Sequence, residues 1–246
     1  MRIVTWNCSG ALRKKLDAAD SLQADILVIQ ECEDPNRSTK EYKAWAGHYL
    51  WIGENKNKGI GIFSRKGAKL TPLYWTGAFQ PSSTSNLTFH LTDLKLFLPC
   101  LVNDDITLVG IWTKEGQFST FSYIGQLWLY LQMVKNQLNG LKAIFCGDFN
   151  SNVCWDKKDR WWNHSDVVQE FSKLKMGSAY HHFHKEDYGS ELEHTYYHYR
   201  KLTKPYHIDY TFLSNEMLAT SKTAIGSASQ WLSISDHMPL ITDFRV

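Results

Sequence analysis

Residues 142–150 read KAIFCGDFN, a stretch that joins an apolar run to two polar side chains. The run Lys142–Cys146 is short and apolar, which is typical of a strand in a sheet interior. Asp148 and Asn150 follow it closely. Functional side chains collect on loops that a rigid scaffold holds in place. This stretch therefore predicts both a central strand and part of a functional site at its end.

Other acidic and amide side chains repeat this placement. Asn7 directly follows the apolar run 3–6, and Glu31 follows the run 26–30. Two further acids lie in compact motifs, Asp209 in HIDY at 207–210 and Asp236 in SDH at 235–237. A carboxylate inside an apolar run must be paired or bound to a metal. We therefore expect Asp209 to have a partner.

Short strand-like runs alternate with helical patterns, which favours an α/β fold. The expected strands are Arg2–Trp6, Asp25–Ile29, Gly59–Phe63, Asp105–Trp112, Lys142–Cys146, His207–Leu213 and Leu240–Phe244. Apolar residues at three- and four-residue spacing predict a helix over Phe118–Leu138, with Gly140 as a stop. Gly53–Lys58 and Gln80–Asn86 are expected as surface loops, and neither resembles an interdomain linker. A single domain over 1–246 is predicted.

The composition excludes several classes of protein. No run reaches the roughly 18 apolar residues that a membrane helix needs, and the N-terminus lacks a signal-peptide pattern. Five scattered cysteines without C-x-x-C favour neither a disulfide framework nor a thiolate zinc site. These features predict a cytoplasmic protein without membrane contact. The formal charge of +2 is too close to neutral to identify an anionic partner, and no obligate protein partner is evident.

The polar residues at the strand ends suit one kind of chemistry. Hydrolysis of a phosphodiester needs a cation for the phosphoryl charge, a group that orients or deprotonates water, and a donor to the phosphate oxygens. Carboxylates, amides and a histidine provide these functions. Hard oxygen ligands without nearby cysteines favour Mg²⁺ or Mn²⁺ over Zn²⁺.

In chain order, these motifs resemble those of the endonuclease/exonuclease/phosphatase family. The matching segments are WNCSG at 6–10, QE at 30–31, GDFN at 147–150, HIDY at 207–210 and SDH at 235–237. The details look closest to exonuclease III and abasic-site endonucleases, because N-x-x-G-x-x-R from residue 7 and TY-x-x-YR from residue 195 resemble their motifs. The resemblance implies a DNase I-like, four-layer α/β sandwich, in which two stacked mixed β-sheets are flanked by helices.

The resemblance also implies roles for single residues. Glu31 resembles the principal metal ligand, with Asn7 and Asp236 in or near the coordination shell of Mg²⁺ or Mn²⁺. Whether one or two metal ions act is left open.

The catalytic residues implied by the resemblance are four. Asp148 resembles the residue that orients or activates water, and Asn150 would help to position the nucleophile and the phosphate. His237 resembles the histidine that hydrogen-bonds the scissile phosphate. Asp209 would accept from the other ring nitrogen of His237 and fix its tautomer.

The implied activity is metal-dependent hydrolysis of DNA, as an abasic-site endonuclease, a 3′-5′ exonuclease or both. Because the family uses one core on several substrates, RNA, phosphoinositides or small phosphoesters are the alternative. A binding module without catalysis is a third possibility, and it rests on one departure from the family. Trp112 stands where nucleases of this family commonly have tyrosine or histidine, and Thr113 or Lys114 could replace that contact. Ser9 also replaces an acidic or amide residue of the first motif.

Basic groups near the motifs are candidate DNA contacts. Arg13, with its two neighbouring lysines, is expected in the first turns of a helix, where it could contact DNA or pair with Asp17. Arg200, Lys201 and Lys204 form a second basic group, which could face DNA or simply aid solubility. Tyr199, next to Arg200, is a further candidate contact.

Two aromatic or histidine-rich segments leave their functions open. Trp155, Trp161 and Trp162 are interspersed with cations and could stack on nucleic acid or cover the core. The histidines between His181 and His207 raise the question of zinc, but H-E-x-x-H is absent. Zinc is therefore disfavoured.

Overall fold

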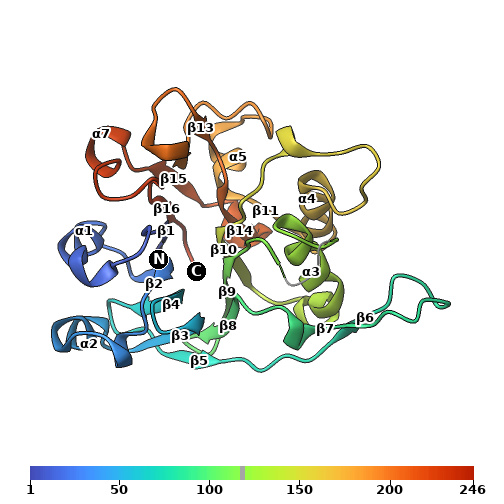
Figure 1. Ribbon diagram of the computed structural model, residues 1–246, viewed down its shortest axis with the longest axis horizontal. Coiled ribbons are helices and arrows are strands. Elements are labelled where there is room, and N and C mark those ends of the chain that lie inside the picture. Colours follow the sequence, from blue (N-terminus) through green and yellow to red (C-terminus); the bar gives the residue numbers. More distant parts are fainter. Residues whose placement is uncertain (117–119) are drawn as a thin grey trace.

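Two six-stranded mixed sheets form the centre of the molecule, and helices cover their outer faces (Figure 1). We analysed a computed structural model that describes residues 1–116 and 120–246. The first sheet has the order β15 (Lys222–Ile225), β16 (Leu240–Asp243), β1 (Arg2–Asn7), β2 (Ile26–Cys32), β4 (Lys58–Ser64) and β3 (Tyr49–Asn55). Within it, β1 and β2 run parallel and the other neighbours run antiparallel.

The second sheet repeats this plan around a different parallel pair. Its order is β11 (Met176–Ser178), β14 (Asp209–Ser214), β10 (Ala143–Asp148), β9 (Ile106–Trp112), β8 (Phe97–Val102) and β5 (Leu70–Pro72). Here β9 and β10 run parallel, and the other neighbours run antiparallel. Each sheet therefore has parallel strands at its centre, with polar residues at their C-terminal ends.

Helices flank both sheets. The first sheet lies against α1 (Leu16–Ser21), α2 (Lys40–Ala46) and α7 (Ala228–Trp231), and the second against α3 (Ile124–Leu138) and α4 (His164–Lys173). Two short helices, α5 (Ala179–His184) and α6 (Asn215–Leu218), lie beside β11 and β14. Helix, sheet, sheet and helix make four layers, so the predicted α/β sandwich is confirmed.

The apolar side chains form three buried layers that follow from the alternation along the strands. In β2, Val28 points into the core between the sheets, whereas Leu27 and Ile29 point toward the helices. Burial of this apolar area is the main favourable term for the fold. Two small hairpins, β6 (Ala78–Phe79) with β7 (Phe89–His90) and β12 (Tyr196–Tyr197) with β13 (Pro205–Tyr206), extend from the sandwich.

Several sequence expectations need correction. The long helix begins at Ile124 rather than Phe118, because Tyr123 has a φ of 52° and interrupts the helical geometry; Phe118 lies outside the described residues. Gly53–Lys58 is no loop, because the chain turns only at residues 56–57 between β3 and β4. Gln80–Asn86 is a loop, as expected, and it connects the projecting β6–β7 hairpin (Figure 1).

Arg13 also differs from expectation. It lies in a 3₁₀ turn, Leu12–Lys14, rather than at the start of an α-helix, and it pairs with Glu33 instead of Asp17. Among the residues that the structure describes, no helix has the length and apolar character needed to span a membrane.

Candidate active site

The predicted site residues meet at one edge of the sandwich because the central strands of both sheets end there. Asn7 ends β1, and Asp148 ends β10 in the other sheet. Asn7 Nδ2 donates to Asp148 Oδ2 across a distance of 3.0 Å. This hydrogen bond joins the two sheets at the candidate site, and both side chains are buried, at 2% and 1% exposed.

The loop after β10 is fixed around the Asp148 carboxylate. Asn150 donates to it twice, from its backbone N to Oδ1 at 2.8 Å and from Nδ2 to Oδ2 at 2.9 Å. The same Nδ2 also donates to the Thr113 carbonyl at 2.8 Å. Asn150 has a φ of 45°, a left-handed conformation that asparagine tolerates better than most residues. The amide therefore holds the carboxylate in a fixed orientation.

Gly147 explains why the motif before Asp148 contains glycine. Its φ is 152°, and a Cβ at this position would lie 1.9 Å from the carbonyl oxygen of Ile111 in the neighbouring strand. No other residue fits there without moving β9 or β10. The glycine therefore lets the two parallel strands approach closely just before the candidate site.

His237 faces both acidic residues of the second sheet. Its Nδ1 lies 2.9 Å from Asp209 Oδ2, and its Nε2 lies 3.9 Å from Asp148 Oδ2. Asp209 is fully buried, and its other oxygen has no hydrogen-bond partner among the described residues. The expectation that Asp209 pairs with His237 is confirmed. With Nδ1–H donating to Asp209, Nε2 points toward Asp148.

The hydroxyl groups of Ser235 and Thr195 fix the backbone of the SDH and HIDY segments. Ser235 Oγ donates to the Asn7 carbonyl at 2.7 Å and accepts from the His237 backbone N at 3.0 Å. Thr195 Oγ1 accepts from the backbone N of Ile208 and of Asp209, each at 3.0 Å. The SDH and HIDY segments are therefore tied to β1 and to residue 195 at fixed positions.

Electrostatics in this buried cluster shift two pKa values. Burial raises the pKa of Asp148, and the nearby His237 only partly opposes that shift. For His237, burial alone would lower the pKa, but the Asp209 and Asp148 carboxylates outweigh it and raise the pKa. The geometry therefore favours a protonated imidazole beside a carboxyl group that can exchange a proton near neutral pH.

Glu31 lies at a bulge in β2, where the register against β4 shifts between Gln30 and Cys32. Its φ of 59° belongs to the left-handed region, and such bulges re-aim side chains. Oε1 lies 3.4 Å from Asn7 Nδ2, and Oε2 pairs with Lys58 Nζ at 2.6 Å. Glu31 therefore adjoins the cluster through Asn7.

Asp236 joins the same neighbourhood by a different route. Its carbonyl accepts from Tyr197 N at 2.8 Å, and its carboxylate acts electrostatically on His237 and on Lys15. Lys15 in turn donates to the Cys8 carbonyl and feels the charge of Arg200. The first-motif loop, the β12–β13 hairpin and the SDH segment therefore meet around Asp236.

The donor chemistry of this edge fits a hard divalent cation. Ligand atoms of Asp148, Asp209 and His237 lie within 4.8 Å of one another. Glu31, Asn7 and Asp236 add oxygen donors nearby, and oxygen donors are what Mg²⁺ and Mn²⁺ prefer. Because His237 Nδ1 is engaged by Asp209, the oxygen donors rather than the imidazole suit such an ion.

The five predicted substrate contacts are not equally placed. Trp112 pairs in register with Asp148, but its ring is only 8% exposed and Lys114 Nζ covers it at 5.5 Å from the ring centroid. Lys114 also pairs with Glu54, and the Arg13 charge is compensated by Glu33 as described above.

Tyr199 and Arg200, by contrast, are on the exposed β12–β13 hairpin. Tyr199 is 73% exposed, and the Arg200 Nη1 donates to the Ser233 carbonyl at 2.9 Å, next to the SDH segment. The sequence analysis missed Lys58, which pairs with Glu31. It included Tyr196 in the TY-x-x-YR motif but gave it no role, and the ring centroid of Tyr196 lies 4.6 Å from that of His237.

Histidines of the segment 181–207 form hydrogen bonds within the fold. None of the segment's histidines belongs to a cluster of three or more potential metal ligands in the described ranges 1–116 and 120–246. His181 instead joins Ser178 at 2.8 Å and Glu191 at 3.1 Å.

The three tryptophans after Asn152 divide between two environments. Trp162 packs against the core. Trp161 packs edge-on against Trp128 with ring centroids 4.9 Å apart but is 51% exposed, and Trp155 is 42% exposed and lies beside Tyr206. Core covering therefore accounts fully only for Trp162.

Comparison with known proteins agrees with this double-sheet hydrolase-type fold. The model of the Endonuclease/Exonuclease/phosphatase family matches residues 4–237. The chain therefore belongs to the endonuclease/exonuclease/phosphatase family. No curated protein matches the chain.

Several solved structures share the fold over their full length. The 3′ phosphatase NExo from Neisseria, bound to a product DNA hairpin, is 20% identical with a TM-score of 0.70, and all of both chains is covered. An AP endonuclease from Archaeoglobus fulgidus is 16% identical with a TM-score of 0.71 and the same coverage. The 3′-5′ exonuclease NExo from Neisseria meningitidis is 20% identical with a TM-score of 0.69, again covering all of both chains.

Proposed function

We propose that this chain is a divalent-metal-dependent phosphodiester hydrolase that acts on DNA, as an abasic-site endonuclease, a 3′-5′ exonuclease or both. The observation that carries the proposal is the buried cluster in which Asp148 faces His237 at 3.9 Å and Asp209 holds the other ring nitrogen. A buried cluster that shifts pKa values at the edge of a sheet is typical of a catalytic site.

Each residue of the cluster has a role that follows from its contacts. Asp148 is held by Asn7 and Asn150 with its carboxylate toward His237, so it orients the attacking water and accepts its proton. The protonated His237 ring donates from Nε2–H to an oxygen of the scissile phosphate, while Asp209 accepts from Nδ1–H and stabilises the charged ring. Asn150 holds the loop after β10 and the Asp148 carboxylate in a fixed relative orientation.

The oxygen donors of Glu31, with Asn7 and Asp236 beside it, would hold Mg²⁺ or Mn²⁺. When bound, such an ion would neutralise negative charge on the phosphoryl group. The side chains of this chain supply the orientation and the proton transfers.

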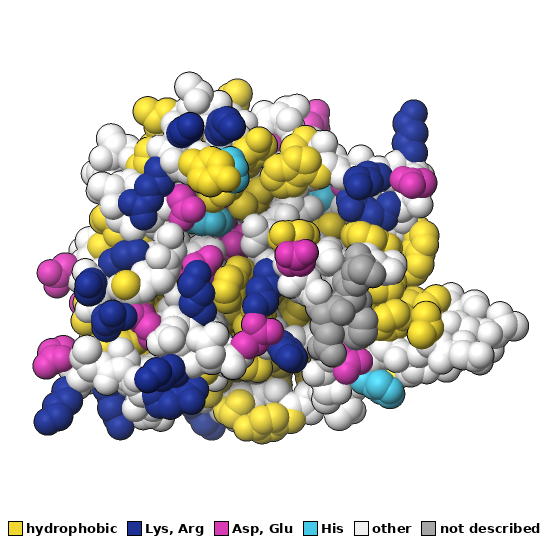
Figure 2. Space-filling model, viewed as in Figure 1, with side chains coloured by type: hydrophobic (Ala, Val, Ile, Leu, Met, Phe, Trp, Pro, Cys, Tyr) yellow, Lys and Arg dark blue, Asp and Glu magenta, His cyan; other side chains and the backbone are white. Residues whose placement is uncertain are grey.

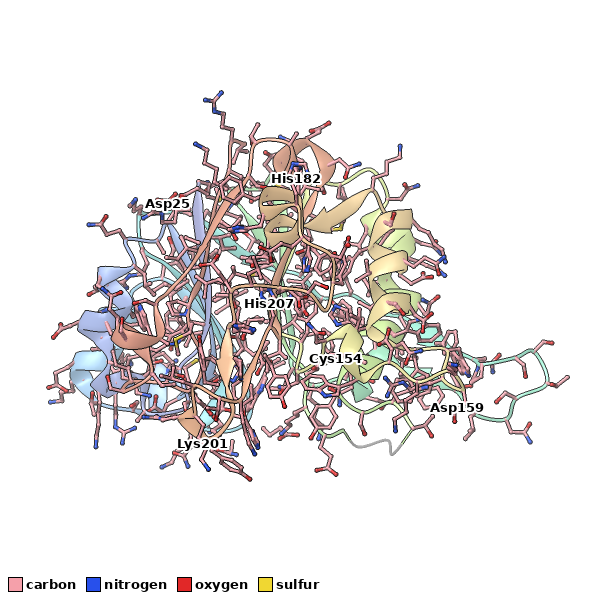
Figure 3. The ribbon with its side chains drawn as sticks, turned by 90° about the horizontal axis from the view of Figure 1, so that it is seen from above. Asp25, Cys154, Asp159, His182, Lys201 and His207 are labelled. Carbon is pink, nitrogen blue, oxygen red and sulfur yellow. The ribbon has the colours of Figure 1, made fainter. Side chains whose placement is uncertain are left out.

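DNA is favoured as the substrate because basic and aromatic side chains surround the site on one face. Figure 3 places Lys201 and Asp159, from the two loops that carry these groups, along one edge, with Asp25 and His182 near the opposite edge. Figure 2 shows Lys and Arg side chains spread over this face among Asp and Glu, including two groups near the top with hydrophobic and histidine side chains between them. Separated basic groups around a cleavage site match the spaced phosphates of a nucleic acid strand. Tyr199, Arg200 and Lys114 are the proposed contacts, with smaller roles for Arg13 and Trp112.

Similar structures add support. The proteins of this fold named above include an AP endonuclease and a 3′ phosphatase bound to DNA. A cytoplasmic location and the absence of an obligate protein partner stay predictions.

The test is cleavage of end-labelled DNA as single strand, intact duplex and duplex with one abasic analogue, each with Mg²⁺, Mn²⁺ or chelator. Metal-dependent incision at the abasic position, or stepwise shortening from the 3′ end, supports the proposal and selects its form. Intact DNA under every metal overturns it, and RNA, phosphoinositides and small phosphodiesters then form the next panel.

A further inference from the structure

A buried carboxylate lies in the segment 185–195, which connects α5 to β12. The Glu191 side chain is only 5% exposed, and its Oε1 accepts from the backbone N of Gly189 at 3.0 Å. Burial alone would raise its pKa, but hydrogen bonds from His181 and from backbone N–H groups outweigh burial and lower the pKa to about 2. A buried charge is unfavourable unless it is paired and hydrogen-bonded. Glu191 is therefore ionised at neutral pH and depends on the donors around it.

His181 connects this carboxylate to the second sheet. Its Nε2 lies 3.1 Å from Glu191 Oε1, and its Nδ1 lies 2.8 Å from Ser178 Oγ at the end of β11. The ring also stacks on Tyr188, with centroids 3.7 Å apart and an interplanar angle of 19°. Because both ring nitrogens are engaged and one face is covered, the imidazole is held in one orientation. His181 therefore fixes Glu191 relative to β11.

Asn152 joins Glu191 to the loop after β10. The Asn152 side chain is buried, and its Nδ2 lies 3.1 Å from Glu191 Oε1 and 3.1 Å from the His207 carbonyl oxygen. Its Oδ1 accepts from the backbone N of Cys154 at 3.1 Å. The two N–H groups of an amide can serve the carboxylate and the carbonyl together. A flipped amide would place its oxygen against both acceptors, so Glu191 helps to set the orientation of Asn152.

The two segments that Asn152 joins carry the proposed catalytic residues. Asn152 follows Asp148 by four residues, and His207 precedes Asp209 by two. Asp148 and Asp209 are partners in register at the ends of β10 and β14. Tyr210 Oη donates to the same His207 carbonyl at 2.9 Å. The amide therefore fastens the loop after β10 to the HIDY segment just beyond the paired strand ends.

We propose that Glu191 and His181 are positioning residues, which act through Asn152 to hold the loop after β10 against the HIDY segment in the orientation that catalysis needs. The inference rests on the proposed function and adds residues to it. Asp148 and His237 must together address one water molecule and one phosphate, and a misplacement of about 1 Å can lower a rate about 10²-fold. The buried Glu191 carboxylate is not available to contact DNA, so its loss should affect turnover rather than binding.

The first test is Glu191→Gln, assayed with Mg²⁺ on the labelled DNA that wild-type protein cleaves. The amide keeps the size of the side chain but loses the charge, and one of its two ends presents N–H groups to the donors of Asn152 or His181. The kcat should fall about 10- to 100-fold, whereas KM should change less than about twofold.

Glu186→Gln is the matched control. Glu186 is another carboxylate of the same segment, and its Oε2 accepts from Tyr180 Oη at 2.8 Å and from the backbone N of Leu192 at 2.9 Å. This variant should leave kcat and KM unchanged. Equal losses of kcat in Glu186→Gln and Glu191→Gln would show that the segment only supports the fold and would overturn the inference. A raised KM with unchanged kcat in Glu191→Gln would overturn it as well.

A double-mutant cycle separates positioning from general stabilisation. Asn152→Ser removes the amide donors but keeps an oxygen that can accept from Cys154 N. In this background Glu191→Gln should lower kcat by less than about twofold, because residues of one hydrogen-bonded network have non-additive effects. His181→Phe keeps a ring over Tyr188 and should behave like Glu191→Gln in both backgrounds. Full additivity of Glu191→Gln and Asn152→Ser overturns the inference.

The second test needs no turnover. The backbone N of Phe149 donates to the Ile208 carbonyl at 2.9 Å, and that of Asn150 donates to Asp148 Oδ1. Amide hydrogen exchange of Phe149 and Asn150, measured by NMR without DNA, should be about tenfold faster in Glu191→Gln than in wild-type protein. It should stay at the wild-type rate in Glu186→Gln.

The exchange measurement also separates the two proposals. Exchange that Glu191→Gln leaves unchanged overturns the inference, whether or not the protein cleaves DNA. If wild-type protein cleaves no DNA, the proposed function fails, but the exchange rates still decide whether Glu191 holds the loop after β10.

Discussion

At the scale of single residues, the candidate site depends on pairs of side chains that control each other's charge and orientation. His237 is useful as a donor only if Asp209 keeps the proton on Nδ1 and stabilises the charged ring. Lys58 opposes the predicted role of Glu31, because its ammonium group forms an ion pair with a carboxylate that is predicted to bind metal.

Asp209→Asn tests the first pair. The amide removes the negative charge that stabilises the protonated His237 ring, so the ring loses a proton more readily and kcat should fall about 10²- to 10⁴-fold. Nitrogen chemical shifts of the His237 ring should report the loss of the doubly protonated form, while the thermal midpoint changes little. Asp243→Asn, which breaks only the surface pair with Arg2, is the control. Unchanged kcat or an unchanged protonation state of His237 would refute the role of Asp209.

Lys58→Met tests the second pair. Lys58 Nζ is 2.6 Å from Glu31 Oε2, and half of its side chain is exposed, so solvent screening leaves an effect of about 1 kcal/mol. Removal of this competing cation should tighten Mn²⁺ binding by about fivefold, measured by electron paramagnetic resonance of the free ion. Lys66→Met, which removes a cation from Asp25 instead, should have no effect. Equal or weaker Mn²⁺ binding in Lys58→Met would contradict the assignment of Glu31.

At the scale of elements, the sequence predicts central strands better than edges and loops. The runs that became β1, β2, β9, β10, β14 and β16 are mostly apolar, because both of their faces are largely covered. Three of the four edge strands, β5, β11 and β15, have three or four residues, which leaves too little pattern to recognise. The GDFN and SDH motifs identified Asp148 and His237, since their identities are local. Lys58 reaches the site only through the folding of distant strands, which no local pattern records. The TY-x-x-YR motif contains Tyr196 but does not indicate that its ring packs beside His237.

A buried histidine at the start of α4 predicts how the stability of the protein changes as the pH falls. Burial lowers the pKa of His164, the first residue of this helix, from 6.5 to about 3, because neither ring nitrogen has a partner among the described residues. Unfolding restores the ordinary value, so the unfolded chain binds the proton first. The stability that neutral His164 provides is complete above about pH 6.5 and is lost as the pH falls toward 3.

His164→Leu should therefore flatten the pH dependence of the unfolding free energy. Between pH 7 and pH 5 the wild-type loss from this residue is about 2 kcal/mol, and urea unfolding at several pH values measures it. His48→Leu, at an exposed histidine, should keep the wild-type slope. A slope that His164→Leu leaves unchanged would show that the ring is protonated or hydrated in the folded protein.

At the scale of the whole molecule, the two sheets share one buried core. Residues of β1, β2 and β4 pack against residues of β9 and β10 in a continuous apolar layer. We propose that residues 1–246 form one domain, because neither sheet can bury this face alone. Calorimetry should show one cooperative transition with equal calorimetric and van't Hoff enthalpies. Two separate transitions would assign the sheets to independent units.

The candidate site exists only in this assembled molecule, since Asn7 and Asp148 come from different sheets. The most direct test of its function is the Mg²⁺-dependent cleavage rate of end-labelled DNA by wild-type protein and by Asp148→Asn, with DNA binding measured for both. The account predicts metal-dependent cleavage that falls at least about 10²-fold in Asp148→Asn, while the dissociation constant for DNA changes less than about threefold. Equal cleavage by the two proteins, or no cleavage by wild-type protein with any divalent metal, would contradict it.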